Sequence, residues 1–517
     1  MAATGDDVGG SKALSRHHHH HHRSNTVTDG TLLTLRYAFG VDGPIRDNLA
    51  FVKVQDPDEE GTGLSVEYIV HPVGQQIALY RAEDGTMRFL LGKPKNVREI
   101  LAMGVSPSKR VIAVCESARV PGEDPGSAQV SVYHIATCKR IRTMLFPAKG
   151  DFVGCCFSGD SKWLLTVGSE PENFVVLWNW DKEKVVRTAQ NHNPASRVCF
   201  NPYTHTRFTT SGRMHLRLWY TSTDNAFKAH SLLPQSREQD NFVDHTWIKG
   251  GAGQPTRMIA ITDGEGIRDA RGASILIFDA TDAHPFLDLK KMIQAQLPGS
   301  TRLETLVAYS KGFIVAGGGV NGFFGVYENL DDQRDPYMLL KNLTAKGEVF
   351  TGLAVNHTSE LVCAYTKSNL LLTFQLGNID VLDEAGEHFQ TLLPGGNHVG
   401  SVVAMDTCLR KPILVTVGAD RMLRVWNYLR WTCDVVFDLR CAEEPTCVAM
   451  HPTGFQVAVG FKDRIRVYNV LMAGLRPVRD ILQKNCRAAS YSNGGHLLAV
   501  TCGFSVLVFS SLTCQQM

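Results

Sequence analysis

The sequence contains no uninterrupted apolar run that approaches the roughly 18 residues of a membrane-spanning helix. Its N-terminus, Met-Ala-Ala-Thr-Gly-Asp-Asp, has no apolar segment of the kind that directs secretion. The 13 cysteines include no C-x-x-C pair, and their irregular spacing favours free buried thiols over a disulfide framework. These absences predict a cytosolic protein without membrane insertion.

An excess of charge of one sign is also missing. The chain has 53 Lys and Arg residues against 51 Asp and Glu residues. Because a nucleic-acid-binding face or a polybasic membrane-binding surface depends on a basic excess, we expect neither kind of partner. Hydrophobic residues make up 44% of the chain and charged residues 20%, proportions typical of a soluble protein with a large core.

The motifs of common catalytic and cofactor sites are absent as well. No G-x-x-x-x-G-K-[ST], H-E-x-x-H or G-x-S-x-G segment occurs. The segment Gly317–Gly322 matches G-x-G-x-x-G, but a nucleotide site needs a helix after it, and the strand-like Phe323–Tyr327 follows instead. Cys155 and Cys156 are neighbours on a predicted strand, so their side chains point to opposite faces and do not favour a metal site. We therefore expect no cofactor, no metal and no small-molecule substrate.

A helical period does not persist for more than about two turns anywhere in the chain. The best helical candidate is the segment 289–296, inside a predicted loop from Asp288 to Thr301. What recurs instead is an aromatic residue near the end of a short apolar strand, at intervals of 41 to 59 residues: Tyr80, Tyr133, Trp178, Trp219, Phe278, Tyr327, Phe374, Trp426, Tyr468 and Phe509. The shorter intervals match the period of WD40 blades, and turn segments such as Ser106-Pro-Ser108 and His451–Gly454 precede the second strand of each unit.

These repeats predict an all-β fold of WD40-type β-propeller blades. Ten units exceed the usual size of one ring, and the acidic segment 378–388 suits a boundary between two rings. We therefore expect a closed seven-bladed propeller over residues 32–385, with the N-terminal strand 33–39 as the outer strand of the seventh blade. Residues 386–517 are expected to form three blades of an incomplete second propeller.

The clearest repeat is a predicted hairpin formed by Ile413–Gly418 and Met422–Tyr428. Its polar residues, with one from the segment before it, match the set that satisfies a buried indole in WD repeats: His398, Thr416, Asp420 and Trp426. We interpret these four residues as a structural network of the blade, and we expect no catalytic residue.

Three arginines occupy equivalent positions, two residues before an aromatic marker: Arg217, Arg424 and Arg466. They could form a basic stripe that binds an acidic partner, such as a tubulin tail. Alternatively, this is an ordinary position of a WD repeat, where the arginine is solvated or stacks on a neighbouring blade. We favour the second interpretation. Long loops are further candidate partner surfaces: 55–63, 117–128, 231–240, 263–272 and 288–301.

Residues 1–31 are rich in Gly, Ser, Asp and Thr, which predicts a disordered tail. They contain six consecutive histidines, His17 to His22. Such a run can bind a divalent metal, but between Ser-Arg and Arg-Ser it is typical of an expression tag or an unstructured tail.

Several phrases resemble a known family. They are Tyr37–Asn48, Arg410–Leu414, Asp420–Tyr428, His451–Gly454 with Val459–Phe461, and Cys486-Arg487 through Ser492–Leu498. In this order and spacing they resemble the ciliary WD-repeat family of cilia- and flagella-associated protein 57, from about residue 36 to residue 510.

The resemblance implies a tandem propeller followed by a coiled coil. It also implies a non-enzymatic scaffold of the motile cilium or flagellum axoneme that helps to place inner-arm dyneins beside the regulatory complex. This sequence lacks the remaining blades and the coiled coil of that pattern. Two alternatives stay open: a general cytosolic WD40 adaptor, such as a ligase substrate receptor or a trafficking coat, and a propeller enzyme with titratable residues at its central channel.

Overall fold

In the residues that it describes, the computed structural model shows an all-β fold of ten antiparallel sheets, nine with four strands and one with three. It describes residues 35–517 apart from 42–44, 46, 56–64, 91–98, 118–126, 223–225, 234–239, 251–254, 265–271, 281–286, 296, 298–301, 320, 330–336, 382–387, 393–396, 441–442 and 473. No helix in the described part of the chain has the length and apolar character needed to cross a membrane.

Seven sheets follow one another from β1 to β28, and we call them the first sheet group. The first four sheets contain β1 (Ala50–Gln55), β2 (Ser65–Val73), β3 (Gln76–Tyr80), β4 (Met87–Leu90); β5 (Glu99–Val105), β6 (Val111–Ser117), β7 (Ser127–His134), β8 (Lys139–Pro147); β9 (Phe152–Phe157), β10 (Trp163–Gly168), β11 (Phe174–Asn179), β12 (Lys184–Gln190); and β13 (Ala195–Asn201), β14 (Thr204–Gly212), β15 (His215–Thr221), β16 (Phe227–Ser231). The next three contain β17 (Phe242–Ile248), β18 (Thr256–Thr262), β19 (Ser274–Ala280), β20 (Leu287–Gln294); β21 (Arg302–Tyr309), β22 (Gly312–Gly318), β23 (Asn321–Asn329), β24 (Tyr337–Lys346); and β25 (Phe350–Val355), β26 (Leu361–Thr366), β27 (Leu371–Gln375), β28 (Gln390–Thr391).

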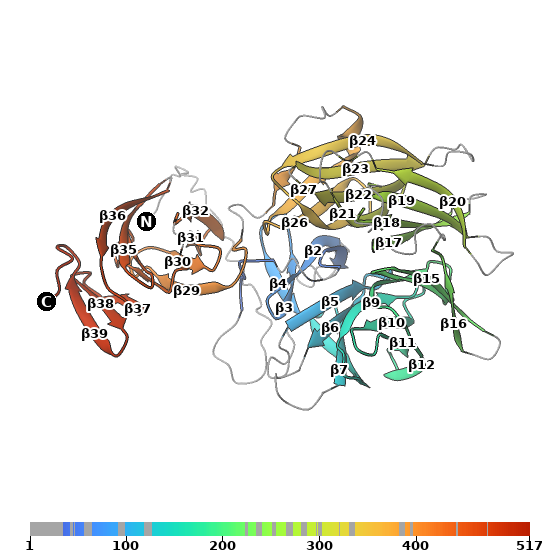
Figure 1. The fold of residues 1–517 in the computed structure, drawn as a ribbon, viewed down its shortest axis with the longest axis horizontal. Helices are drawn as coiled ribbons and strands as arrows, with labels where there is room; N and C mark the ends of the chain where they lie inside the picture. Colours follow the sequence, from blue (N-terminus) through green and yellow to red (C-terminus); the bar gives the residue numbers. More distant parts are fainter. Residues whose placement is uncertain are drawn as a thin grey trace, which may run out of the picture.

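The remaining three sheets form the second sheet group, drawn in orange and red in Figure 1. Its strands are β29 (Val402–Thr407), β30 (Ile413–Gly418), β31 (Met422–Asn427), β32 (Thr432–Asp438); β33 (Cys447–Met450), β34 (Gln456–Gly460), β35 (Ile465–Leu471), β36 (Gly474–Ile481); and β37 (Cys486–Tyr491), β38 (Leu497–Cys502), β39 (Ser505–Ser510). A 3-10 helix, η2 (Leu376–Val381), follows β27.

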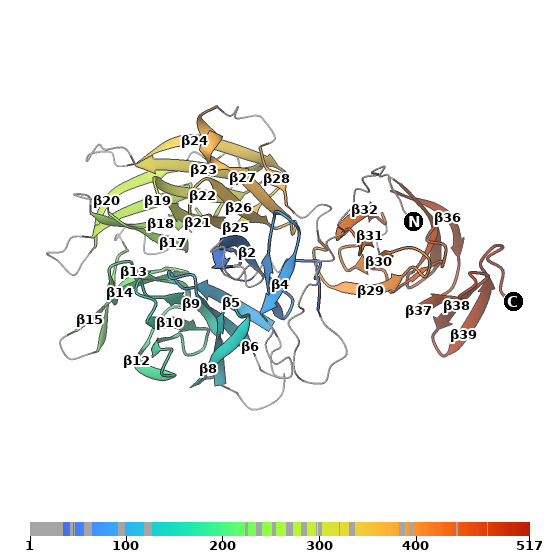
Figure 2. The same cartoon turned by 180° about the vertical axis from the view of Figure 1, so that it is seen from behind.

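From the second sheet to the seventh, the first strand of each sheet contacts the first strand of the next sheet. β5 contacts β9, β9 contacts β13, and this continues through β17 and β21 to β25, which also contacts β1. The fourth strands β16, β20 and β24 lie at the periphery of the group in Figure 1, and Figure 2 shows the same for β20 and β24 from the opposite side. The first strand of each sheet therefore lies toward the middle of the group, and the fourth strand is the outer strand.

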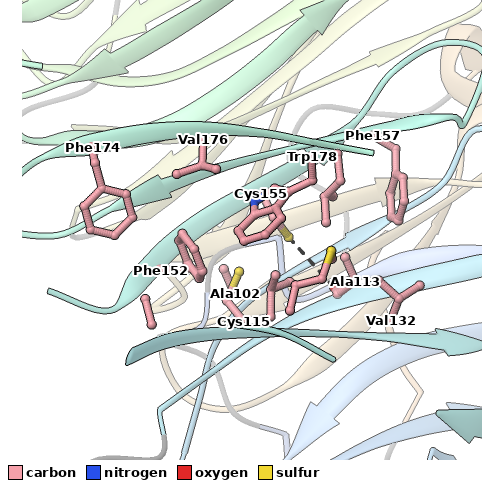
Figure 3. Close-up of a cluster of buried hydrophobic side chains, with 14 of the residues drawn as sticks. Ala102, Ala113, Cys115, Val132, Phe152, Cys155, Phe157, Phe174, Val176 and Trp178 are labelled. Atoms are coloured by element: carbon pink, nitrogen blue, oxygen red, sulfur yellow. Dashed lines mark hydrogen bonds between the residues drawn. The ribbon is translucent and has the colours of Figure 1, made fainter. Parts of the chain in front are cut away.

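The core lies between neighbouring sheets, since each sheet buries apolar side chains on both faces. Between the second and third sheets, Cys115, Phe152, Phe174 and Trp178 pack together (Figure 3). The Cys155 thiol in this cluster points toward the carbonyl oxygen of Ala113, 3.8 Å away. Strand alternation sends Cys156 to the opposite face, where it packs against the cluster shared with the fourth sheet.

All ten aromatic markers of the sequence lie on the third strand of a sheet, and all are buried. An aromatic side chain at this position fills the space between two neighbouring sheets, because third-strand side chains alternate between the two faces. None of the described cysteines is in a disulfide.

Two expectations about local structure are wrong. The segment 289–296, the best helical candidate, lies mostly in strand β20, because pairing with β19 overrides its local pattern. Residues 35–41 form no strand, and the fourth strand beside β27 is β28, so the described part of the expected strand 33–39 does not complete the seventh sheet. Because β28 reaches Thr391, the expected boundary at 385/386 falls inside the connection between β27 and β28.

Candidate functional site

The four residues of the predicted blade network come together around the β30–β31 hairpin. The indole Nε1 of Trp426 donates to Thr416 Oγ1 at 2.8 Å, and the same hydroxyl lies 2.8 Å from His398 Nε2. His398 Nδ1 lies 2.9 Å from Asp420 Oδ1. One proton arrangement satisfies the chain: Nδ1–H donates to Asp420, the Thr416 hydroxyl donates to Nε2, and the indole donates to Thr416.

Asp420 also fixes the backbone on both sides of the network. Its carboxylate accepts hydrogen bonds from the amides of Met422, at 3.1 Å, and Val399, at 3.0 Å. Burial by itself raises the pKa of this carboxyl, but the hydrogen bond and charge of His398, together with the two amides, outweigh burial and lower the pKa to about 2. The carboxylate thus holds the turn of the hairpin against the segment that leads into β29.

Arg424 belongs to the same network. The sequence analysis did not identify this role. Its Nη1 donates to Asp420 Oδ2 at 3.0 Å, and its Nη2 donates to the carbonyl of Asn397 at 2.9 Å. The signal in the sequence is strand alternation, because residues 424 and 426 share one face of β31. Arg424 is buried, so this member of the proposed basic stripe is not a solvent-facing cation.

The other two arginines of the proposed stripe also have partners within the chain. Arg217 Nη1 donates to Asn191 Oδ1 at 2.9 Å, and Arg466 pairs with Asp480 through contacts of 2.6 and 2.7 Å. Contacts with other residues of the chain therefore account for these three side chains.

A second network in the fourth sheet reaches a similar result with different residues. Trp219 Nε1 donates to Thr210 Oγ1 at 2.9 Å, and His215 Nε2 lies 2.7 Å from that hydroxyl and 3.1 Å from Asn191 Nδ2. Here the imidazole comes from β15, not from the segment before the sheet, which is why the sequence pattern did not reveal it. Burial lowers the pKa of His215 to about 3, and the charge of Arg217 adds to this, so the imidazole is neutral near pH 7.

The network of the eighth sheet lies at the contact between the two sheet groups. Asn397 Nδ2 donates to the carbonyl of Asn369 at 3.1 Å, and Asn369 donates to the carbonyl of His398. Asn369 occupies the turn between β26 and β27, where it has a positive φ of 58°. This turn therefore joins the seventh sheet to the segment that positions His398.

The N-terminal segment 35–41 covers part of the same contact. Tyr37 stacks on Trp431, with centroids 4.5 Å apart and an interplanar angle of 16°. The ring of Phe39 lies 4.6 Å from that of Trp426. The next residues turn to the first group, where the Tyr365 hydroxyl donates to the carbonyl of Val41 at 3.3 Å. We call Tyr37–Val41 the aromatic strap.

A cavity of about 1150 Å³ lies beside the strap and extends to the middle of the first group. It is lined by residues of both groups, among them Phe39, Asp47, Arg197, Asp244, Met405 and Trp426. Three of its charged groups pair with one another: Arg197 Nε lies 2.9 Å from Asp244 Oδ1, and Arg197 Nη1 contacts Asp47. Asp244 Oδ2 also accepts from the amide of Leu306 at 2.9 Å.

In the networks and ion pairs described above, the polar groups of the chain bind one another. The Asp420–His398–Thr416 series has the residue types of a catalytic triad, but the Thr416 hydroxyl accepts the Trp426 N–H and contacts His398, and Thr416 is buried.

The segment Gly317–Gly322 lies across the β22–β23 pairing, an antiparallel hairpin and not a strand followed by a helix. His17–His22 and most of the long loops at 55–63, 117–128, 231–240 and 263–272 lie outside the described residues.

Comparisons with known proteins confirm the resemblance found in the sequence. The chain is 26% identical over 498 residues to "Cilia- and flagella-associated protein 57" of Mus musculus, covering 87% of this chain and 38% of that protein. It is 22% identical over 551 residues to "Cilia- and flagella-associated protein 57 C" of Tetrahymena thermophila, covering 90% of this chain and 39% of the relative. The chain thus spans about two fifths of the length of these curated relatives.

A shorter similarity links the chain to "Cilia- and flagella-associated protein 44" of Mus musculus, at 27% identity over 188 residues, 36% of this chain and 9% of that protein. Among solved structures, the "Structure of Dos1 propeller" aligns with a TM-score of 0.43 and 12% identity, covering 80% of this chain and 92% of that chain. No family model matches the chain.

Proposed function

We propose that this chain is a non-enzymatic WD-repeat scaffold of the cilium or flagellum axoneme. The observation that carries the proposal is the similarity over most of the chain to relatives named as cilia- and flagella-associated proteins. The buried networks support it, because their histidines, hydroxyls and carboxylates serve each other and the backbone. A scaffold needs a rigid frame that presents surfaces, and such networks supply rigidity.

The architecture within this proposal is a seven-bladed closed propeller followed by three blades of a second propeller. Closure is supported by an apolar cluster that the first and seventh sheets share, in which Phe51 and Ile69 pack with Cys363 and Leu371. A closed ring leaves no sheet face open at its ends, so every sheet of the ring can bury both faces against its neighbours. The first propeller extends to Thr391 in this view, and the second begins with the segment that holds His398.

The partners that we propose are axonemal proteins: inner-arm dynein components, components of the regulatory complex, and tubulin. We propose no nucleic acid, membrane or small-molecule partner. The near balance of 53 basic and 51 acidic residues supports the first two exclusions.

Fractionation of ciliated cells tests the scaffold role. The tagged chain is expected to remain with axonemes after detergent extraction and a salt wash, because a scaffold is held by several contacts. Cross-links from the retained chain to dynein or regulatory-complex subunits then identify the partners. Recovery of all the protein in the detergent-soluble fraction contradicts the axonemal role and favours a general cytosolic adaptor.

A further inference from the structure

The outer strands of the first sheet group carry charge of almost one sign. β4, β8, β12, β16, β20, β24 and β28 contain eleven basic residues, namely Arg88, Lys139, Arg140, Arg142, Lys184, Arg187, Lys228, Lys290, Lys291, Lys341 and Lys346. Their one acidic residue is Asp288. The whole chain has 53 basic and 51 acidic residues, so the composition of the chain does not explain this bias.

Contacts between neighbouring sheets connect several of these outer strands to the next sheet. Arg142 of β8 donates to the Asp181 carbonyl at 3.0 Å, at the turn before β12. Arg187 of β12 donates to Thr221 Oγ1 of the next sheet at 2.9 Å, and Lys291 of β20 donates to the Tyr337 carbonyl of β24 at 2.9 Å. We call β8, β12, β16, β20 and β24 the basic band.

Lysines between these contacts face solvent. Lys139, Lys184, Lys228 and Lys290 are exposed, one on each of four successive outer strands. Exposed apolar side chains lie among them, including Leu145, Leu289, Met292 and Met338. The band thus combines cationic and apolar groups along strands that are paired on one side only in the described sheets.

Protection of sheet edges does not by itself account for the band. Lysine on an edge strand discourages pairing with other chains, but this need is the same in both sheet groups. The outer strands of the second group carry both signs, because β32 contains Asp434 and Asp438 while β36 contains Arg476, Arg479 and Asp480. The sign bias therefore belongs to the first group, which indicates a partner and not a general edge rule.

We propose that the basic band is a docking surface for an extended, glutamate-rich polypeptide segment of a partner protein. Carboxylates of the segment would meet the exposed lysines, and its backbone would pair with a free strand edge between them. This inference rests on the proposed scaffold role, since it supplies the surface by which such a scaffold holds an acidic partner. It replaces the stripe of Arg217, Arg424 and Arg466, whose guanidinium groups already have partners within the chain.

Binding of a fluorescent peptide of ten glutamates to the full chain tests the proposal. The peptide is expected to bind at low salt and to be released as the salt concentration rises, because exposed charges are screened over about 8–10 Å near physiological ionic strength. A peptide of ten glutamines is the neutral control and is expected not to bind. Absence of glutamate-peptide binding at low salt overturns the proposal.

Charge-reversed variants locate the site. The triple variant Lys184→Glu, Lys228→Glu and Lys290→Glu is expected to bind the peptide at least about tenfold more weakly, since like charges then face each other. The matched control Lys462→Glu, Lys484→Glu and Arg487→Glu makes the same change in net charge at exposed positions of the second group and is expected to bind like wild type. Equal weakening in both variants overturns the assignment to the band.

Competition identifies the class of ligand. Duplex DNA or anionic vesicles that displace the peptide at equal charge concentration overturn the polypeptide assignment. Axoneme fractionation separates this inference from the proposed function: a chain that binds the peptide through the band and yet is fully detergent-soluble supports the band and contradicts the axonemal role.

Discussion

At the scale of single residues, the indole of Trp426 is the centre of a closed polar series on the eighth sheet. It is buried beneath Phe39 and gives its N–H to Thr416. Trp426→Ala removes both the apolar volume and the hydrogen bond, so we expect the free energy of unfolding of the second group to fall by about 3–5 kcal/mol. Urea unfolding followed by circular dichroism measures this.

Leu429→Ala is the control for that variant, because Leu429 is 70% exposed and its truncation is expected to cost less than about 0.5 kcal/mol. If the two variants unfold at the same urea concentration, Trp426 is not the buried anchor described above.

Asp420 gives the second prediction at this scale, a pH dependence. Its folded-state pKa of about 2 lies below the value near 3.9 of an unfolded chain. The carboxylate therefore stabilises the fold fully above about pH 4, and this contribution is lost as the pH falls from about 4 toward 2. The stability difference between wild type and Asp420→Asn is expected to be largest at neutral pH and to shrink in this acid range.

Urea unfolding at a series of pH values from 7 down to the acid range measures this difference. Asp434→Asn changes an exposed carboxylate of the same sheet and is the control. A wild-type advantage over Asp420→Asn that stays constant down to the lowest pH would show that the carboxylate charge does not stabilise the network.

At the scale of elements, the aromatic strap is a segment without regular structure that connects the two sheet groups. Tyr37 and Phe39 cover Trp431 and Trp426, while Val41 binds Tyr365 in the seventh sheet. Tyr37→Ala with Phe39→Ala is expected to expose both indoles and to shift tryptophan fluorescence to longer wavelength. Phe504→Ala, at a fully exposed ring, is expected to leave the spectrum unchanged. An unshifted spectrum in the double variant means that the strap does not cover these indoles.

Elements also show where local sequence patterns mislead. Segment 289–296 has a helix-like pattern, but residues Leu287–Gln294 pair with β19 as a strand, because an outer strand gains backbone hydrogen bonds that a short isolated helix cannot match. Residues 33–39 have a strand-like pattern. In the structure, however, Tyr37 and Phe39 pack against Trp431 and Trp426 of the second sheet group. In both places the neighbouring element, and not the local pattern, determines the conformation.

At the scale of the whole molecule, Arg197 joins parts of the first group that are far apart in sequence. It extends from β13, pairs with Asp244 of β17 and contacts Asp47 of the segment that leads into β1. Arg197→Met leaves two carboxylates without their cation near the middle of the group, which is expected to destabilise the fold by about 3 kcal/mol.

Lys311→Met is the control, because Lys311 is 74% exposed and lies 3.9 Å from Glu328, so its loss is expected to cost at most about 1 kcal/mol. Thermal unfolding of both variants measures the difference. If Arg197→Met unfolds like wild type, the ion pairs at the centre do not hold the sheets together.

The sequence by itself determined the repeating all-β plan, the ten aromatic anchors and the meeting of His398, Thr416, Asp420 and Trp426. These follow from short-range rules, since strand alternation and a buried indole restrict which residue types stand at each position. Only the tertiary structure decided that Arg424 completes the network, that His215 replaces the usual histidine, that the strap covers Trp426 and that the outer strands align their lysines. Each of these depends on side chains from segments far apart in sequence, and the packing of one sheet against the next brings them together.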